Sequence, residues 1–142
     1  MAKNQRALNK GSKGQNRKGS EAFVIKYANK PEVVQMDSGL MYRILEDAQG
    51  PAPTMISEVV VNQRILNFDG SVIADTYKSG ITDRFTLKEA IPGLQEGLQL
   101  MALGSRYEFV IPSELAWGKR GVGNKIGPNA LMVFDVRLVE IA

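Results

Sequence analysis

Only one stretch of this chain has a good helical pattern of apolar residues, and strand-like stretches lie on both sides of it. In IPGLQEGLQLMALG, Leu94, Leu98 and Met101 recur at helical spacing. Pro92 suits the first turn, where its missing N–H leaves no hydrogen bond unmade, and Gly104 suits the position just after the last turn. One short helix packed on one twisted sheet is an α+β arrangement.

The strand-like stretches support this fold class. In SEVVVNQRIL every second residue from Val59 to Ile65 falls on one face, as in a strand. Asp69 and Gly70 predict a tight turn into SVIADTY, because glycine accepts a positive φ. Further strands are expected in GLMYRILEDA, SRYEFVIP and ALMVFDVRLVEI. We therefore expect several antiparallel strands, one short helix, and then more strands.

The composition narrows the chemistry. The 142 residues suit one domain, and the chain contains neither cysteine nor histidine. Disulfides, thiolate chemistry, the commonest general base and the commonest metal ligand are therefore excluded. The loop GKRGVGNKIG lacks the spacing of a phosphate-binding loop. Asp69 and Asp75 lack the spacing of an EF-hand, and one of them lies at a predicted turn, so a solvated turn is favoured over a metal site. We predict no metal and no cofactor.

The N-terminal region differs in charge from the rest. Residues 1–20 hold six of the 18 basic residues and none of the 15 acidic ones, whereas the whole chain has a net charge of +3. We predict a disordered basic tail over 1–20 and a lead-in segment over 21–37. Ser20 would cap a short helix in SEAFVIKYANK that ends before Pro31, although VIKY also suits a strand.

The same tail bears on partners and location. Its charge predicts weak, salt-dependent contact with RNA or a ribosomal surface, and a solvated linker is the alternative. No apolar run approaches the ~20 residues that a membrane span needs. The N-terminus also lacks the apolar region of a secretory signal. These features predict a cytoplasmic protein that does not contact a membrane.

Residues 38–142 resemble the FKBP-type peptidyl-prolyl cis-trans isomerases. In order, IPG opens the helix, EGL lies within it, MALG closes it, IPSELAWG follows a strand, and NALMVFDVRL forms the last strand. SGLMYRIL, ISEVVVNQRIL and DGSVI extend the match towards the N-terminus. The resemblance implies a half-open antiparallel sheet wrapped around one helix. SEAFVIKYANK resembles the start of the domain in the bacterial Mip-like branch, with the basic tail expected in place of that branch's helical arm.

The resemblance also implies an activity and a site. Rotation of an Xaa-Pro bond must overcome a barrier of ~18 to 20 kcal/mol, but no bond is formed or cleaved. An apolar pocket that excludes water favours the twisted, less charge-separated amide, so neither nucleophile nor cofactor is required. By position, the catalytic walls are Phe85, Ile91, Trp117 and Phe134, and the substrate-binding residues are Gln63, Ile73, Ala74, Leu94 and Ile126. The Ile91 N–H would hold a substrate carbonyl.

One half of this site departs from the family pattern. Gln63, Ile65, Ile73 and Ala74 stand where the family has tyrosine, glycine, phenylalanine and aspartate. Two functions remain open: an isomerase of lowered or altered efficiency, or a proline-directed binding or chaperone module with little catalysis. The implied partners are proline-containing polypeptides and macrolide-type ligands. Trp117 is expected to form a pocket wall, with a place at the edge of the core as the alternative.

Overall fold

The computed structural model describes residues 13–118, 121, 126–127 and 129–142. A long helix and a short strand come first, followed by the strands and short helices of the main body. The elements in chain order are α2 (Lys13–Ala28), β1 (Val34–Gln35), β2 (Met41–Glu46), β3 (Glu58–Asn67), β4 (Val72–Asp75), α3 (Thr76–Ser79), β5 (Asp83–Thr86), the 3-10 turn η1 (Leu87–Glu89), α4 (Pro92–Leu98), β6 (Arg106–Ile111), the 3-10 turn η2 (Ser113–Leu115) and β7 (Met132–Ile141).

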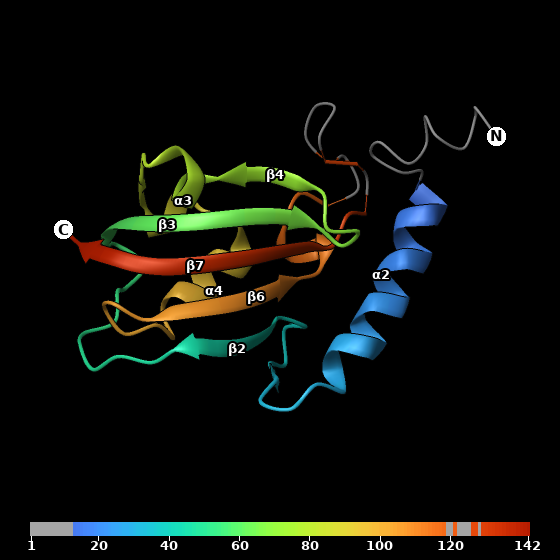
Figure 1. The fold of residues 1–142 in the computed structure, drawn as a ribbon, viewed down its shortest axis with the longest axis horizontal. Coiled ribbons are helices and arrows are strands. Elements are labelled where there is room, and N and C mark those ends of the chain that lie inside the picture. The colour runs from blue at the N-terminus through green and yellow to red at the C-terminus, as the bar shows by residue number, and fades with distance from the viewer. Residues whose placement is uncertain (1–12, 119–120, 122–125, 128) are drawn as a thin grey trace.

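In the described part of the chain, seven strands form one antiparallel sheet in the order β1-β2-β6-β7-β3-β4, with β5 also paired to β3. The two longest strands, β3 and β7, run side by side at its centre (Figure 1). The other edge of β3 is shared by two short strands. β5 pairs with residues 58–61, and β4 pairs with residues 64–66.

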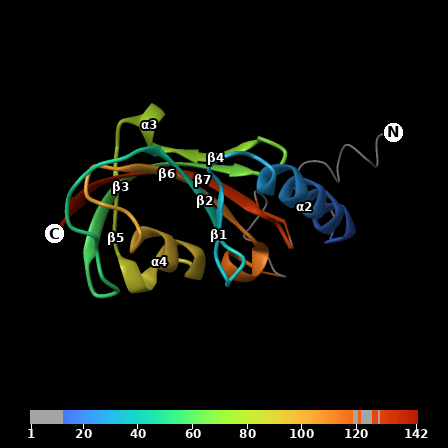
Figure 2. The same ribbon diagram turned by 90° about the horizontal axis from the view of Figure 1, so that it is seen from below.

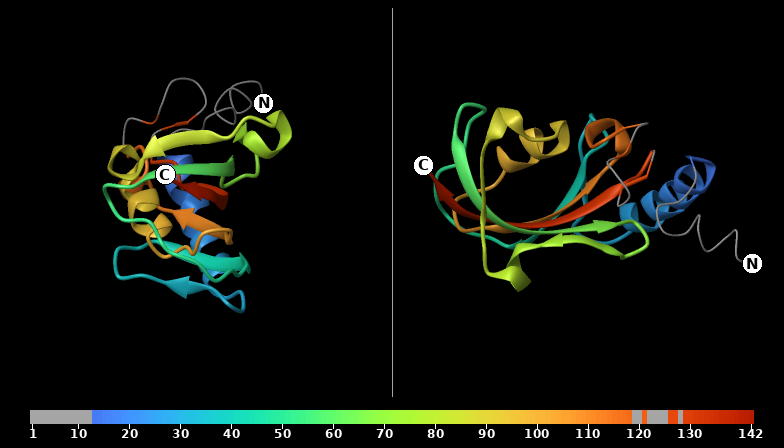
Figure 3. Two further views of the ribbon diagram at one scale, coloured as in Figure 1. Left: turned by 90° about the vertical axis from the view of Figure 1, so that its left-hand side faces the viewer. Right: turned by 90° about the horizontal axis from the view of Figure 1, so that it is seen from above.

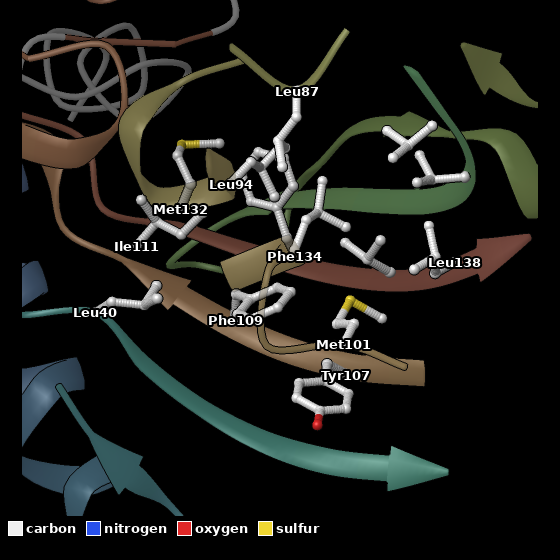
Figure 4. Packing of buried hydrophobic residues seen from close by; sticks show 14 of the residues in the cluster. Leu40, Leu87, Leu94, Met101, Tyr107, Phe109, Ile111, Met132, Phe134 and Leu138 are labelled. Carbon is white, nitrogen blue, oxygen red and sulfur yellow. The ribbon is translucent and has the colours of Figure 1, made fainter. Parts of the chain in front are cut away.

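Helix α4 lies on the concave face of the curved sheet (Figures 2 and 3). Side chains from α4, β6 and β7 fill the space between helix and sheet (Figure 4). Two glycines let the helix approach closely. A Cβ added at Gly93 would lie 2.5 Å from Cγ2 of Ile111, and one added at Gly97 would lie 2.6 Å from Cε1 of Phe109. Gly93 and Gly97 therefore allow helix α4 to pack closely against β6.

Helix α2 packs against the opposite face. Val110 and Val133 alternate along their strands with core residues of the concave face, so they point the other way, towards Tyr27 of α2. The Tyr27 hydroxyl donates to Oε1 of Glu108 at 2.9 Å, and Nε of Arg43 donates to the same oxygen at 2.8 Å. Burial and the neighbouring carboxylate raise the pKa of Tyr27, so the phenol stays a donor.

The α+β fold predicted from the sequence is confirmed, but three details were wrong. Helix α2 begins at Lys13 and not near Ser20, so residues 13–20, predicted as disordered tail, are helical. Helix α4 ends at Leu98, and Gly104 serves a later turn with a φ of +91°. Helix α3 and strand β5 were missed, because four-residue elements carry too little periodicity. The prediction for residues 1–12 lies outside the described residues.

We predict that Gly97→Ala lowers the free energy of unfolding by about 1 to 2 kcal/mol. The new methyl group must displace the buried Phe109 ring, and overpacking of this kind outweighs the better helix propensity of alanine. Urea unfolding measures the change. Adding Phe109→Leu should recover part of the loss by making room. A midpoint for Gly97→Ala at or above that of the wild type would contradict the close contact.

Candidate functional site

A hollow of about 280 Å³ opens between α4, the concave face of the sheet and the η2 turn. Six separate elements or turns bring side chains to it, although these residues are far apart in the sequence. The described residues of its lining are Gln63, Ile65, Phe85, Glu89, Ala90, Ile91, Leu94, Trp117 and Phe134.

The walls of this hollow are mainly apolar and aromatic. Phe134 on β7 and Leu94 on α4 are 1% and 5% exposed, so both join the lining to the core. Trp117 is half-buried and stacks on Phe134, with ring centroids 6.2 Å apart and an angle of 23° between the planes. Phe85 is brought in by the pairing of β5 with β3 opposite Val59. A ligand here exchanges water for aromatic and aliphatic contacts.

The turn after β6 places the indole. Pro112 follows the strand, and its carbonyl accepts from the N–H of Leu115 at 2.9 Å to start η2. The Gly118 N–H then donates to the Ser113 carbonyl at 2.8 Å. Gly118 has a φ of +63°, which favours glycine. This tight turn directs Trp117 back over the sheet, where it contacts both the hollow and the edge of the core.

Ile91 contributes a backbone donor as well as a side chain. Its carbonyl accepts from the N–H groups of Leu94 and Gln95, both at 3.0 Å, at the start of α4. Its own N–H has no acceptor among the residues that the structure describes. A donor without a partner at the rim of an apolar hollow is suited to a carbonyl oxygen of a bound chain.

The polar side of the hollow centres on Gln63, which is 7% exposed. Its backbone N–H donates to Oγ1 of Thr76 at 2.8 Å, and its side-chain Nε2 donates to Oδ2 of Asp83, also at 2.8 Å. Glu89 also lines the hollow, and its carboxylate accepts from the backbone N–H of Thr86. This side of the lining is therefore held by hydrogen bonds within the chain.

The structure brings together six of the nine residues predicted for the site: Gln63, Phe85, Ile91, Leu94, Trp117 and Phe134. The other three do not belong to the described lining. Ile73 packs against the core from β4, and Ile126 is 5% exposed inside the same core. Ala74 on β4 pairs with Ile65 of the lining, next to a register shift between β3 and β4, but it is not itself among the described lining residues.

Sequence reasoning did not select Ile65, Glu89 and Ala90 as lining residues. Ile65 lies two residues after Gln63 on the same face of β3, so strand alternation already indicated it. The segment TLKE has the Thr-x-x-Glu spacing of a capping box, and Thr86 and Glu89 form one at η1. The Thr-x-x-Glu spacing therefore predicts where the turn η1 begins and that Glu89 lies in it.

Three acidic residues outside the hollow have structural roles. Asp69 accepts from the N–H of Ser71 at 2.9 Å, and Asp75 caps α3. Glu108 is the acceptor that holds Tyr27 and helix α2. The described residues contain no group of three side chains able to hold a metal ion. Nor does any helix within them have the length and apolar character needed to cross a membrane.

A larger hollow of about 820 Å³ lies elsewhere, between helix α2 and the η2 turn. Its described lining includes Val24 and Ile25 from the helix, with Pro112, Glu114 and Leu131 from the facing side. None of the residues predicted for the site reaches it. The smaller hollow brings together six of those nine residues, so we take it as the candidate site.

Comparison with known proteins matches residues 50–139 to the family described as FKBP-type peptidyl-prolyl cis-trans isomerase. Residues 1–44 match the family described as the domain amino terminal to FKBP-type peptidyl-prolyl isomerase. The basic N-terminal segment therefore resembles the domain that it was expected to replace, in agreement with the early start of α2.

Individual relatives give the same result. The chain is 37% identical to "Outer membrane protein MIP" of Legionella longbeachae, over 99% of this chain and 60% of that protein. It is 38% identical to "Peptidyl-prolyl cis-trans isomerase Mip" of Coxiella burnetii, over 89% and 55%. The crystal structure of FkpA from Escherichia coli superimposes with a TM-score of 0.87 at 36% identity, over 91% and 60%. The chain thus spans little more than half the length of these relatives.

We predict that Trp117→Ala weakens the binding of a proline-containing peptide by about 1 to 3 kcal/mol, because one aromatic wall is lost. Peptide titration followed by NMR measures the affinity, and urea unfolding measures the stability. Ile81→Ala, which removes an apolar side chain that is 74% exposed and outside the lining, is the control. A loss of ~3 to 5 kcal/mol in stability with unchanged affinity would place Trp117 in the core instead.

Proposed function

The chain belongs to the family of FKBP-type peptidyl-prolyl cis-trans isomerases, and on that premise we propose that it catalyses the isomerisation of Xaa-Pro bonds in polypeptides. One observation carries the proposal. The aromatic and aliphatic hollow formed by Phe85, Leu94, Trp117 and Phe134 adjoins a backbone N–H of Ile91 that has no acceptor among the described residues. A prolyl ring and the carbonyl beside it fit these two features.

The proposed chemistry is non-covalent. A planar Xaa-Pro amide is stabilised by resonance, which the twisted transition state loses at ~18 to 20 kcal/mol. The planar amide is also the more charge-separated form, so a hollow that excludes water favours the twisted one. Every 1.4 kcal/mol by which the hollow prefers the twisted amide accelerates rotation tenfold.

The residues of the site divide this work. Phe85, Trp117 and Phe134 enclose the prolyl ring, and Leu94 closes the floor. The Ile91 N–H holds the substrate carbonyl, so that rotation occurs about the amide and not by movement of the whole peptide. No step requires a nucleophile or a proton shuttle, which is consistent with a chain that has no histidine or cysteine.

We further propose that the isomerase domain begins near residue 38 and that the preceding residues form an accessory segment. Contact with RNA or a ribosome stays a prediction. Three of the six basic residues on which it rests, Lys3, Arg6 and Lys10, lie outside the described residues. Binding of macrolide-type ligands and a cytoplasmic location also stay predictions. One relative is named as an outer membrane protein, and this name describes the relative and not this chain.

We predict slow but measurable isomerisation of short Xaa-Pro peptides, with a preference for an apolar Xaa because the walls of the hollow are apolar. NMR exchange spectroscopy on a peptide with both isomers populated measures the rate without a coupled protease. Trp117→Ala should lower the rate, whereas the matched control Ile81→Ala should not.

A folded protein that leaves the exchange rate at its value in buffer, even at high protein concentration, would refute the activity. If such a protein still bound the peptide, the result would indicate a proline-directed binding module.

A further inference from the structure

Among the side chains of the described lining, only the Gln63 amide has a buried polar atom without a hydrogen-bond partner. Its nitrogen is bonded to Asp83, but Oε1 is buried and has no hydrogen-bond donor among the residues that the structure describes. Buried acceptors are nearly always paired in folded proteins, because an unpaired one loses its bond to water without replacement. An orphan acceptor in the wall of a cavity therefore indicates a missing donor.

Asp83 fixes which end of the amide is free. An ionised carboxylate can only accept hydrogen bonds, so the atom at 2.8 Å from its Oδ2 must be the NH₂ group of Gln63. Turning the amide over would bring two oxygens together at the same distance. The side chain of Gln63 therefore presents an acceptor, and not a donor, away from Asp83.

The location of Gln63 makes a bound ligand the natural source of the missing donor. Gln63 lines the hollow, whereas Asp83, its bonding partner, is not among the described lining residues. Oε1 itself is buried, so a ligand reaches it only if the side chain turns, and the last torsion of a glutamine side chain is soft enough to allow such a turn. Glu89, another polar side chain of the lining, is also an acceptor. A ligand that offers an N–H here gains a bond, and one that offers a carbonyl does not.

We propose that Gln63 is a specificity-determining residue whose Oε1, oriented by Asp83, accepts a hydrogen bond from a backbone N–H that flanks the bound proline. Proline itself has no N–H, so the donor belongs to the residue before it or after it. The inference rests on the proposed function, since it concerns the substrate of the same site. Asp83 is a positioning residue in this scheme and does not touch the substrate.

The polarity of this contact is a property of this chain. A tyrosine, which the family pattern has at position 63, carries a hydroxyl that can donate as well as accept. The aspartate of the family pattern corresponds to Ala74, which does not line the hollow, and Asp83 supplies a carboxylate from β5 instead. Gln63 and Asp83 thus form a polar edge that differs from the family pattern in residue type and in the strand of origin.

The test uses three peptides that contain the same Xaa-Pro-Yaa core. One is the parent, one has the Pro-Yaa amide replaced by an ester, and one has the amide before Xaa replaced by an ester. Each ester removes a single N–H and keeps the shape. For the wild type we expect kcat/KM to fall about tenfold for one of the two esters, and the affected ester identifies the donor. The parent peptide also tests the proposed function, which fails by itself if that peptide is not isomerised.

Gln63→Met keeps the length of the side chain and removes the acceptor. We expect this variant to isomerise the parent peptide more slowly. We also expect its ester ratio, which is kcat/KM for the parent divided by kcat/KM for the affected ester, to lie within about twofold of one. Once the acceptor is gone, removing the peptide N–H that it would have bonded costs nothing more. Gln35→Met, the same change at an exposed glutamine on β1, should keep the wild-type ratio. Asp83→Asn allows the side-chain amide of Gln63 to turn over, because an asparagine at position 83 can donate as well as accept. We expect this variant to reduce the tenfold ester ratio to about threefold. This measurement keeps the proposal testable even if Gln63→Met does not fold.

Two results would overturn the proposal while leaving the isomerase intact. One is a wild type that isomerises the parent and both esters equally well. The other is an ester ratio that stays near tenfold in Gln63→Met and in Asp83→Asn, which would assign the N–H to another acceptor.

Discussion

The close contact between helix α4 and strand β6 is the constraint on which the rest of the domain depends. The helix has only seven residues, too short to be stable alone, and it is held by burying Leu94 and Leu98 against the concave sheet. Gly93 and Gly97 allow this approach because a Cβ at either position would overlap a buried side chain of β6. The resulting position of α4 leaves the hollow at its N-terminal end, so the packing of the core and the shape of the site have the same cause.

The two faces of the sheet have different roles in the structure. The concave face is apolar and holds the hollow, where the side-chain amide of Gln63 is bonded to Asp83. The convex face carries helix α2, which is attached by apolar contacts and by the bond from Tyr27 to Glu108. Helix α2 therefore covers core strands without occupying the candidate site. The proposed reaction requires this arrangement, because an apolar hollow that excludes water acts on the amide only if its mouth stays free.

Residues that carry strong patterns were predictable, and contacts between distant segments were not. The place of Leu94 and Phe134 in the site followed from a long ordered resemblance, and strand alternation put Gln63 and Ile65 on one face. The bond from Gln63 to Asp83 joins residues 20 positions apart on strands whose pairing no local pattern specifies. For the same reason the sequence did not indicate that the carboxylate beside Gln63 would come from Asp83 on β5 and not from β4. The start of α2 was missed because its first turns are basic and contain glycine, features equally typical of disordered chain.

The account is tested most directly by locating the bound prolyl ring. Intermolecular nuclear Overhauser effects between a proline-containing peptide and the methyl-labelled and aromatic-labelled protein would do so without any mutation. The account predicts contacts from the prolyl ring protons to Phe85, Leu94, Trp117 and Phe134. Contacts confined to Val24, Ile25 and Leu131, which line the larger hollow beside α2, would contradict it.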